Sequence, residues 1–319
     1  MRKEDLRIVY MGTPDFAVES LKVLYENGYN IVGVVTMPDK PVGRGHKIQF
    51  SPVKQFALDH NLRLLQPERL KDEAFVDELR SLNADLQIVV AFRMLPEIVW
   101  NMPRLGTFNL HASLLPQYRG AAPINWAVIN GDKETGVTTF FLKHEIDTGN
   151  IILQEKIDIL AEDNAGTIHD KLMILGGQLT KKTVDCILEE NVKEIPQKED
   201  IELRSAPKIF KDTCRLSFEN EVENVHNFVR GMSPYPTAWI ELLHKESKDL
   251  TTMKIFETSF EKKQSQFLAG TILTDNKTFA KIVCSDGELS LLSVQLAGKK
   301  RMSIKDLLCG FALSDFEIK

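Results

Sequence analysis

The first half of the chain alternates between short apolar runs and longer stretches with helical periodicity. The apolar runs have the length of buried strands and read LRIVYM (6–11), NIVGVVT (30–36), LRLLQ (62–66), LQIVVAF (86–92) and GTFNLHA (106–112). DFAVESLKVLYENG (15–28) and LKDEAFVDELRSL (70–82) lie between them and carry apolar residues at helical spacing. This alternation predicts an α/β fold with a doubly wound, mostly parallel sheet.

The same pattern continues to about residue 190. APINWAVING (122–131) predicts a helix, and TGVTTFFLK (135–143) and NIILQEKIDI (150–159) predict a pair of strands. A long helix is expected over 165–190, because Ile168, Leu172 and Leu179 recur at helical spacing after Asn164, a residue suited to cap the helix. We therefore assign residues 1–190 to one domain.

The hydrophobic pattern changes after residue 190. Residues 191–207 are polar and extended, which favours a linker, and 208–319 contain one helix-like stretch followed by short β-like runs. Several short strands separated by turns predict a small barrel or an open sheet. Residues 208–319 are therefore expected to form a second, β-rich domain.

Composition narrows the class of protein. The 319 residues are 43% hydrophobic and 27% charged with a net charge of −5, so contact with a nucleic acid would need a local basic patch. The four cysteines form no CxxC pair and have no histidine at zinc-ligand spacing. No apolar run approaches membrane-spanning length. We expect a cytoplasmic protein without a metal site.

The first turn after the first predicted strand argues against a dinucleotide cofactor. It reads GTPDFA rather than GxGxxG, so Pro14 and Asp15 stand where glycines would let a pyrophosphate approach. No Walker A sequence occurs either.

Proton-handling chemistry is better supported, at the end of the strand GTFNLHA. Asn109 and His111 are two positions apart, so their side chains point to the same side of a strand, at the end where open α/β sheets place their sites. An amide can donate to an oxyanion, a neutral imidazole can accept a proton, and Asp147 of the loop EIDTGN could stabilise the imidazolium. A satisfied buried polar pair and a turn aspartate explain the same residues without any function.

A family resemblance favours the catalytic interpretation. The segment NLHASLLPQYRG (109–120), followed by DTG (147–149) with Asp147 36 positions after His111, resembles the core of the folate-dependent formyltransferases. GTPDFA is similar to the first turn of that family. The resemblance covers essentially the whole chain and implies a Rossmann-like catalytic domain with a smaller, OB-like C-terminal barrel.

The resemblance also implies a mechanism and a set of residues. The donor would be 10-formyltetrahydrofolate, with Asn109, His111 and Asp147 as catalytic residues and no activated serine. The expected folate-binding residues are Arg93, Leu95, Ser113, Leu114, Leu115 and Pro116. Arg93 departs from the family, which more often has Gly at that position.

Within the family, TMPDKPVGRGHKIQFSPVK (36–54) resembles the tRNA-facing loop of the members that act on methionyl-tRNA. SAPKI (205–209) and the β-rich region are similar to the linker and second domain of those members. The implied acceptor is the α-amine of methionine on initiator tRNA, and we expect a monomer. The expected tRNA-binding residues are Lys40, Arg44, Lys47, Lys299, Lys300 and Arg301.

Two alternatives stay open at this point. One is a related folate-dependent enzyme that transfers the formyl group to a small molecule or to water. The other is a tRNA-binding module without catalysis, against which the presence of Asn109, His111 and Asp147 argues.

Overall fold

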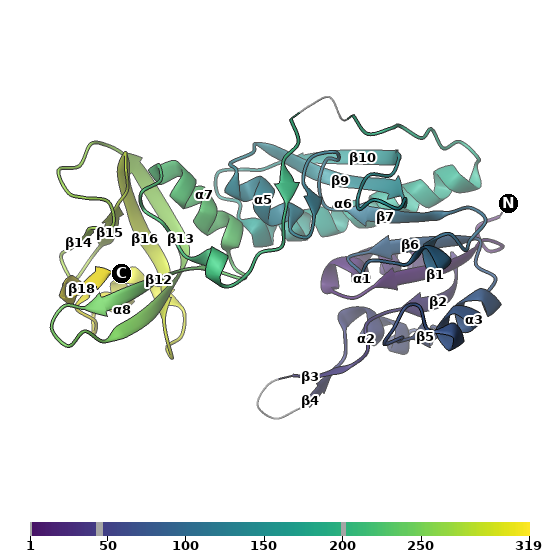
Figure 1. Ribbon diagram of the computed structural model, residues 1–319, viewed down its shortest axis with the longest axis horizontal. Coiled ribbons are helices and arrows are strands. Elements are labelled where there is room, and N and C mark those ends of the chain that lie inside the picture. The colour runs from purple at the N-terminus through teal and green to yellow at the C-terminus, as the bar shows by residue number, and fades with distance from the viewer. Residues whose placement is uncertain (1, 43–46, 199–201) are drawn as a thin grey trace. The chain divides into compact units, whose positions relative to one another are not determined.

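The computed structural model describes residues 2–42, 47–198 and 202–319, which form two compact units (Figure 1). The first unit contains 1–120, 135–157 and 169–205, and the second contains 121–134, 158–168 and 206–319. The units thus interleave along the chain. The predicted division into 1–190, 191–207 and 208–319 stays a prediction.

A mostly parallel sheet forms the centre of the first unit, as the alternating pattern predicts. Its strands lie in the order β10-β9-β7-β6-β1-β2-β5, and neighbouring strands from β7 to β5 all pair in parallel. β9 runs antiparallel to β7. The bounds are β1 (Arg7–Gly12), β2 (Asn30–Val35), β5 (Leu64–Leu65), β6 (Leu86–Val90), β7 (Thr107–His111), β9 (Glu134–Phe141) and β10 (Ile151–Asp158).

The chain order explains where a site can form. From β1 the chain first builds outward to β2 and β5, then returns to β6 and continues to β7 on the other side of β1. In such doubly wound sheets the functional site lies beyond the carboxyl ends of the strands near this reversal. β7 lies next to β6, and its carboxyl end carries Asn109 and His111.

The helices join to the sheet through the apolar positions that the sequence pattern indicates. Val9 of β1 and Val89 of β6 share a buried cluster with Phe75 and Leu79 of α3. Ser51 caps α2 by accepting a hydrogen bond from the Lys54 amide. The helices and short strands outside the second unit's barrel are α1 (Asp15–Glu26), α2 (Pro52–Asp59), α3 (Glu73–Ser81), α4 (Glu97–Trp100), α6 (Ala165–Leu188), β8 (Arg119–Gly120) and β11 (Ser205–Ala206).

The long connection after β2 has more structure than its sequence indicates. β3 (Lys40–Val42) pairs antiparallel with β4 (Lys47–Gln49), and α2 begins at Pro52. Three-residue strands are too short to give a recognisable alternation of apolar and polar residues, which is why the sequence predicts only a loop here.

The second unit contains an antiparallel, nearly closed barrel, which confirms the expected β-rich fold. Its main sheet has the order β14-β15-β16-β13-β12-β18, and hydrogen bonds between Asn276, after β14, and Ser314, before β18, join the two edges. Val225 and Val229 of α7 lie in its core. The bounds are α5 (Pro123–Ile129), η1 (Asp212–Cys214), α7 (Val222–Met232), β12 (Ala238–His244), β13 (Leu250–Lys262), β14 (Ile272–Thr274), β15 (Ala280–Val283), β16 (Gly287–Leu296), β17 (Met302–Ser303), α8 (Ile304–Leu308), η2 (Leu313–Asp315) and β18 (Phe316–Ile318).

Candidate active site

Strand β7 carries the two polar side chains that the sequence singles out. Asn109 pairs with Val89 of β6, and His111 pairs with Thr138 of β9, so the strand is held on both sides. The strand alternation puts Asn109 and His111 on the same face of the sheet. Within the described part of the chain, the side-chain amide of Asn109 makes no hydrogen bond, which leaves its N–H groups available to a ligand.

The hydrogen bond of His111 assigns the position of its proton. Nε2 lies 2.8 Å from the carbonyl oxygen of Tyr118, and a carbonyl can only accept. Nε2 of the neutral ring therefore carries the hydrogen, and Nδ1 has the free lone pair. The side chain is only 8% exposed, so its orientation is set by the protein rather than by solvent.

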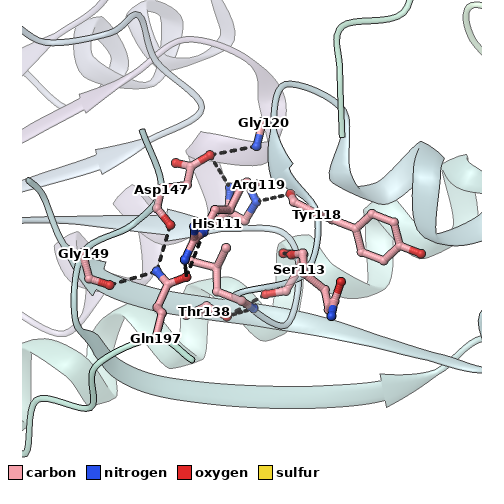
Figure 2. Close-up of polar contacts among 11 residues, drawn as sticks. His111, Ser113, Tyr118, Arg119, Gly120, Thr138, Asp147, Gly149 and Gln197 are labelled. Atoms are coloured by element: carbon pink, nitrogen blue, oxygen red, sulfur yellow. Dashed lines mark hydrogen bonds and ion pairs between the residues drawn. The ribbon is translucent and has the colours of Figure 1, made fainter. Parts of the chain in front are cut away.

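Asp147 faces the free nitrogen of His111 (Figure 2). Its Oδ2 lies 3.9 Å from Nδ1, which is beyond hydrogen-bonding distance, and the side chain is 15% exposed. The Gly120 amide donates to the same oxygen over 2.9 Å. The carboxylate is therefore held near Nδ1, where a positive charge on the His111 ring would be stabilised.

The loop after β7 is held by hydrogen bonds of its own. Ser113 is fully buried and donates to the Gln117 carbonyl over 2.6 Å, so its hydroxyl serves the turn. The Thr138 hydroxyl donates to the Ser113 carbonyl and accepts from the Leu115 amide. Leu115 is buried against Phe140 and Ile151, whereas Leu114 and Pro116 are half-buried. These residues shape a rigid wall beside His111.

Arg93 has a structural role that the sequence does not reveal. Its guanidinium donates to the carbonyls of Pro67 and Glu68 over 2.7 and 2.9 Å, and burial lowers its pKa. Its Nε is buried without a partner among the described residues. Leu95, two residues on, belongs to the same apolar cluster as Val89 of β6. Arg93 thus ties the segment after β6 to the segment after β5.

The expected tRNA-binding residues fall into two groups. Lys40 and Lys47 belong to the hairpin of β3 and β4, and Arg44 lies outside the described residues. Lys299, Lys300 and Arg301 follow β16 in the second unit and are exposed.

Within that second group, Arg301 is already engaged. It forms an ion pair with Glu257, donates to the Ser293 hydroxyl and lies 4.4 Å over the Phe256 ring. Lys299 and Lys300, by contrast, have no side-chain partner within the described part of the second unit.

The second unit also has a groove that the sequence gives no reason to expect. It encloses about 750 Å³, and Tyr235, Trp239, Lys208, Lys211 and Lys254 are among its lining residues. A groove lined by both lysine and aromatic side chains suits a phosphate backbone with exposed bases. These residues come from separate segments, so only the folded chain brings them together.

Three residues that contact the site were not found from the sequence. Tyr118 and Gly120 follow His111 in the segment QYRG, and their closeness to it in the sequence is the signal that could have indicated them. Gln197 donates to the carbonyls of Asp147 and Gly149, although it comes from the polar segment expected to be a linker. No sequence pattern distinguishes it from its polar neighbours.

Neither a metal cluster nor a membrane span is found over the ranges that the structure describes. No group of three or more His, Cys, Asp or Glu residues there could hold a metal ion. Likewise, none of the helices described is both long enough and apolar enough to cross a membrane.

Comparison with known proteins identifies the two parts of the chain. The profile described as Formyl transferase matches residues 6–184, and that described as Formyl transferase, C-terminal domain, matches residues 208–312. A Bacteroides thetaiotaomicron protein named methionyl-tRNA formyltransferase is 65% identical over 99% of this chain and 98% of its own length. One of the same name from Parabacteroides distasonis is 62% identical over 98% of this chain and 97% of its own.

A solved structure shows the same fold at low identity. The N-formyltransferase from Helicobacter canadensis, in complex with folinic acid and dTDP-3-aminofucose, superposes with a TM-score of 0.64 at 19% identity. The alignment covers 90% of this chain and 98% of that one.

Proposed function

The chain belongs to the formyl transferase family and formylates methionyl-tRNA, and we propose that its donor is 10-formyltetrahydrofolate and that Asn109, His111 and Asp147 carry out the transfer. The observation that carries the catalytic assignment is the arrangement of His111 Nδ1, with its lone pair free, 3.9 Å from Asp147. Folinic acid in the Helicobacter canadensis relative supports a formyl-folate donor.

The residues suit an attack by an amine on a formyl carbon. The methionine α-amine is its own nucleophile, so a bond forms between its nitrogen and the formyl carbon, and the formyl oxygen becomes negatively charged. The Asn109 amide donates a hydrogen bond to this oxygen. His111 Nδ1 accepts the proton that the amine loses, and Asp147 stabilises the resulting imidazolium.

His111 also completes the reaction. The proton on His111 passes to N10 of the folate as the bond between N10 and the formyl carbon breaks. The products are a formylated methionyl group and tetrahydrofolate, and no metal enters this balance. Because His111 Nε2 remains hydrogen-bonded to Tyr118, the ring keeps one orientation through both proton transfers.

The test is transfer of labelled formyl from 10-formyltetrahydrofolate. We expect label on methionyl initiator tRNA and little on methionyl elongator tRNA. Release of tetrahydrofolate with water or an amino sugar, without label on methionyl-tRNA, would contradict the proposal. We further propose that the protein acts in the cytoplasm as a monomer.

The sequence GRGH at residues 43–46, outside the described residues, offers a prediction about tRNA. Arg44 is flanked by Gly43 and Gly45, and its guanidinium can bind a phosphate or stack on a base. We expect Arg44→Ala to lower kcat/KM for methionyl-tRNA by about tenfold, the scale of one charge-assisted contact, with folinic acid affinity unchanged. Unchanged tRNA kinetics, or an equal loss of folinic acid affinity, would remove Arg44 from tRNA recognition.

The basic turn of the second unit allows a matched comparison. Replacing Lys299 and Lys300 together by Ala should weaken tRNA binding. The slope of the logarithm of the binding constant against the logarithm of salt concentration should become smaller in magnitude by up to about two, one for each phosphate that the variant no longer binds. Arg301→Ala should change the slope less, because its guanidinium is paired with Glu257. Salt titrations of tRNA binding measure both. Equal slopes in the wild type and the double variant would show that this turn does not contact tRNA.

A further inference from the structure

Gln197 lies in the polar segment between α6 and β11, and its side chain reaches the loop that carries Asp147 (Figure 2). We propose that Gln197 is a positioning residue for formyl transfer, which holds the Asp147 carboxylate at its place beside His111. The inference rests on the proposed catalytic role of Asp147. Gln197 acts on the reaction through Asp147 and not through a direct bond to His111.

Both the nitrogen and the oxygen of the Gln197 side-chain amide are hydrogen-bonded. Nε2 donates to the carbonyl oxygens of Asp147 and Gly149 over 2.8 and 2.9 Å. Oε1 accepts from Nε and Nη2 of Arg119 over 3.0 and 2.7 Å. Carbonyls only accept and a guanidinium only donates, so the partners admit a single orientation of the amide.

These contacts form a closed ring around Asp147. Gln197 binds the main chain of Asp147 on one side and the side chain of Arg119 on the other. Arg119 is bonded to Gly120, whose amide donates to Oδ2 of Asp147 over 2.9 Å. The amide of Gln197 therefore holds both the backbone of Asp147 and the strand that binds its carboxylate.

The backbone conformation of Asp147 explains why these hydrogen bonds from Gln197 are needed. Asp147 has a φ of 56°, in the left-handed region that residues other than glycine seldom adopt. Such a conformation persists where neighbouring contacts over-determine it. The bonds from one amide to the carbonyls of Asp147 and Gly149 meet this requirement, because they hold the loop on both sides of Thr148.

The segment itself is anchored independently of the Gln197 side chain. Ile195 forms a bridge with Ile151 through two backbone hydrogen bonds of 2.8 and 2.9 Å. Asn150 also donates to the carboxylate of Glu194 over 2.8 Å. Substituting Gln197 therefore removes these hydrogen bonds of its side chain while leaving the segment attached, so the variants test the side chain.

Two substitutions distinguish the bonds to the carbonyls of Asp147 and Gly149 from the bonds to Arg119. Gln197→Ala removes all of them, whereas Gln197→Glu keeps an acceptor for Arg119 and turns oxygen toward the carbonyls of Asp147 and Gly149. We expect both to lower kcat by about 10- to 100-fold, as for a misplacement of about 1 Å. KM for methionyl-tRNA and the Kd of folinic acid should stay within about threefold, because neither ligand touches Gln197 in the proposed mechanism.

Asn150→Ala is the matched control. It removes the bond to Glu194 between the same two segments and the bond from Lys143 to Asn150, but leaves Gln197 bonded to the Asp147 and Gly149 carbonyls. Its kcat should therefore equal that of the wild type. If Asn150→Ala lowers kcat as much as Gln197→Ala, the segment stabilises the fold in general and the inference is wrong. Wild-type kcat in Gln197→Ala would equally overturn it.

A double-mutant cycle with Asp147→Asn tests the route of the effect. If Gln197 acts through Asp147, adding Gln197→Ala to Asp147→Asn should lower single-turnover formyl transfer by less than about threefold. Full multiplication of the two effects would overturn the inference. Wild-type activity in Asp147→Asn alone would refute the proposed role of Asp147, whereas a large decrease there beside a normal Gln197→Ala would refute only the role of Gln197.

Discussion

Asp147→Asn should lower kcat for formyl transfer by at least about 100-fold, because the neutral amide cannot stabilise the imidazolium that His111 becomes. The substitution keeps an oxygen that can accept from the Gly120 amide, so the loop should retain its place. The measured decrease therefore reports the charge of Asp147 rather than a change in the fold.

The other two members of the site should lose activity for different reasons. His111→Ala removes the proton acceptor and should cost about 100- to 10,000-fold in kcat, the range for general bases. Asn109→Ala removes the oxyanion donor and should cost about 100- to 1,000-fold. The assay is single-turnover transfer of labelled formyl to methionyl initiator tRNA at saturating enzyme.

His144→Ala provides the control within the same loop. Its side chain is 74% exposed, pairs with Glu97 and lies edge-on to the Trp100 ring, away from His111, so we expect wild-type kcat. Thermal unfolding and folinic acid binding should be near wild type for Asp147→Asn. A kcat within a few-fold of the wild type for Asn109→Ala, His111→Ala or Asp147→Asn would remove that residue from the mechanism.

Gly149→Ala should damage both stability and catalysis. A Cβ atom at this position would lie 1.6 Å from the carbonyl oxygen of Phe141, a backbone atom that no side-chain rotation can move. The loop must shift to admit the methyl group, at a cost of about 3 kcal/mol or more, the upper part of the range for overpacking. Because Asp147 lies two residues away, we also expect kcat to fall by about 100-fold.

Thermal unfolding and kinetics together check this prediction. A decrease of about 3 kcal/mol in the free energy of unfolding corresponds to a decrease in Tm of about 6–12 °C for a unit of this size. Gly310→Ala is the control, since a Cβ there would meet nothing within 4 Å. Wild-type Tm and kcat in Gly149→Ala would show that the loop accommodates a side chain and that its conformation does not position Asp147.

The sequence determined the elements and the candidate residues, because both depend on local patterns. Buried strands need short apolar runs, so Ile8, Val9 and Ile88 indicate the parallel sheet without knowledge of their partners. Strand alternation is equally local and places Asn109 and His111 on one face. Asp147 was a candidate from its loop alone, and the family motif linked it to His111, because no periodicity relates residues 36 positions apart.

Tertiary structure alone decided the partners of each polar group. The Tyr118 carbonyl assigns the proton of His111, the Glu257 carboxylate occupies Arg301, and the guanidinium of Arg93 joins two loops. Gln197 is one polar residue of an expected linker in the sequence, yet it contacts the Asp147 loop in the fold. Hydrogen bonds and ion pairs act over about 3–4 Å in space and carry no fixed spacing along the chain, so only the folded backbone determines which groups meet.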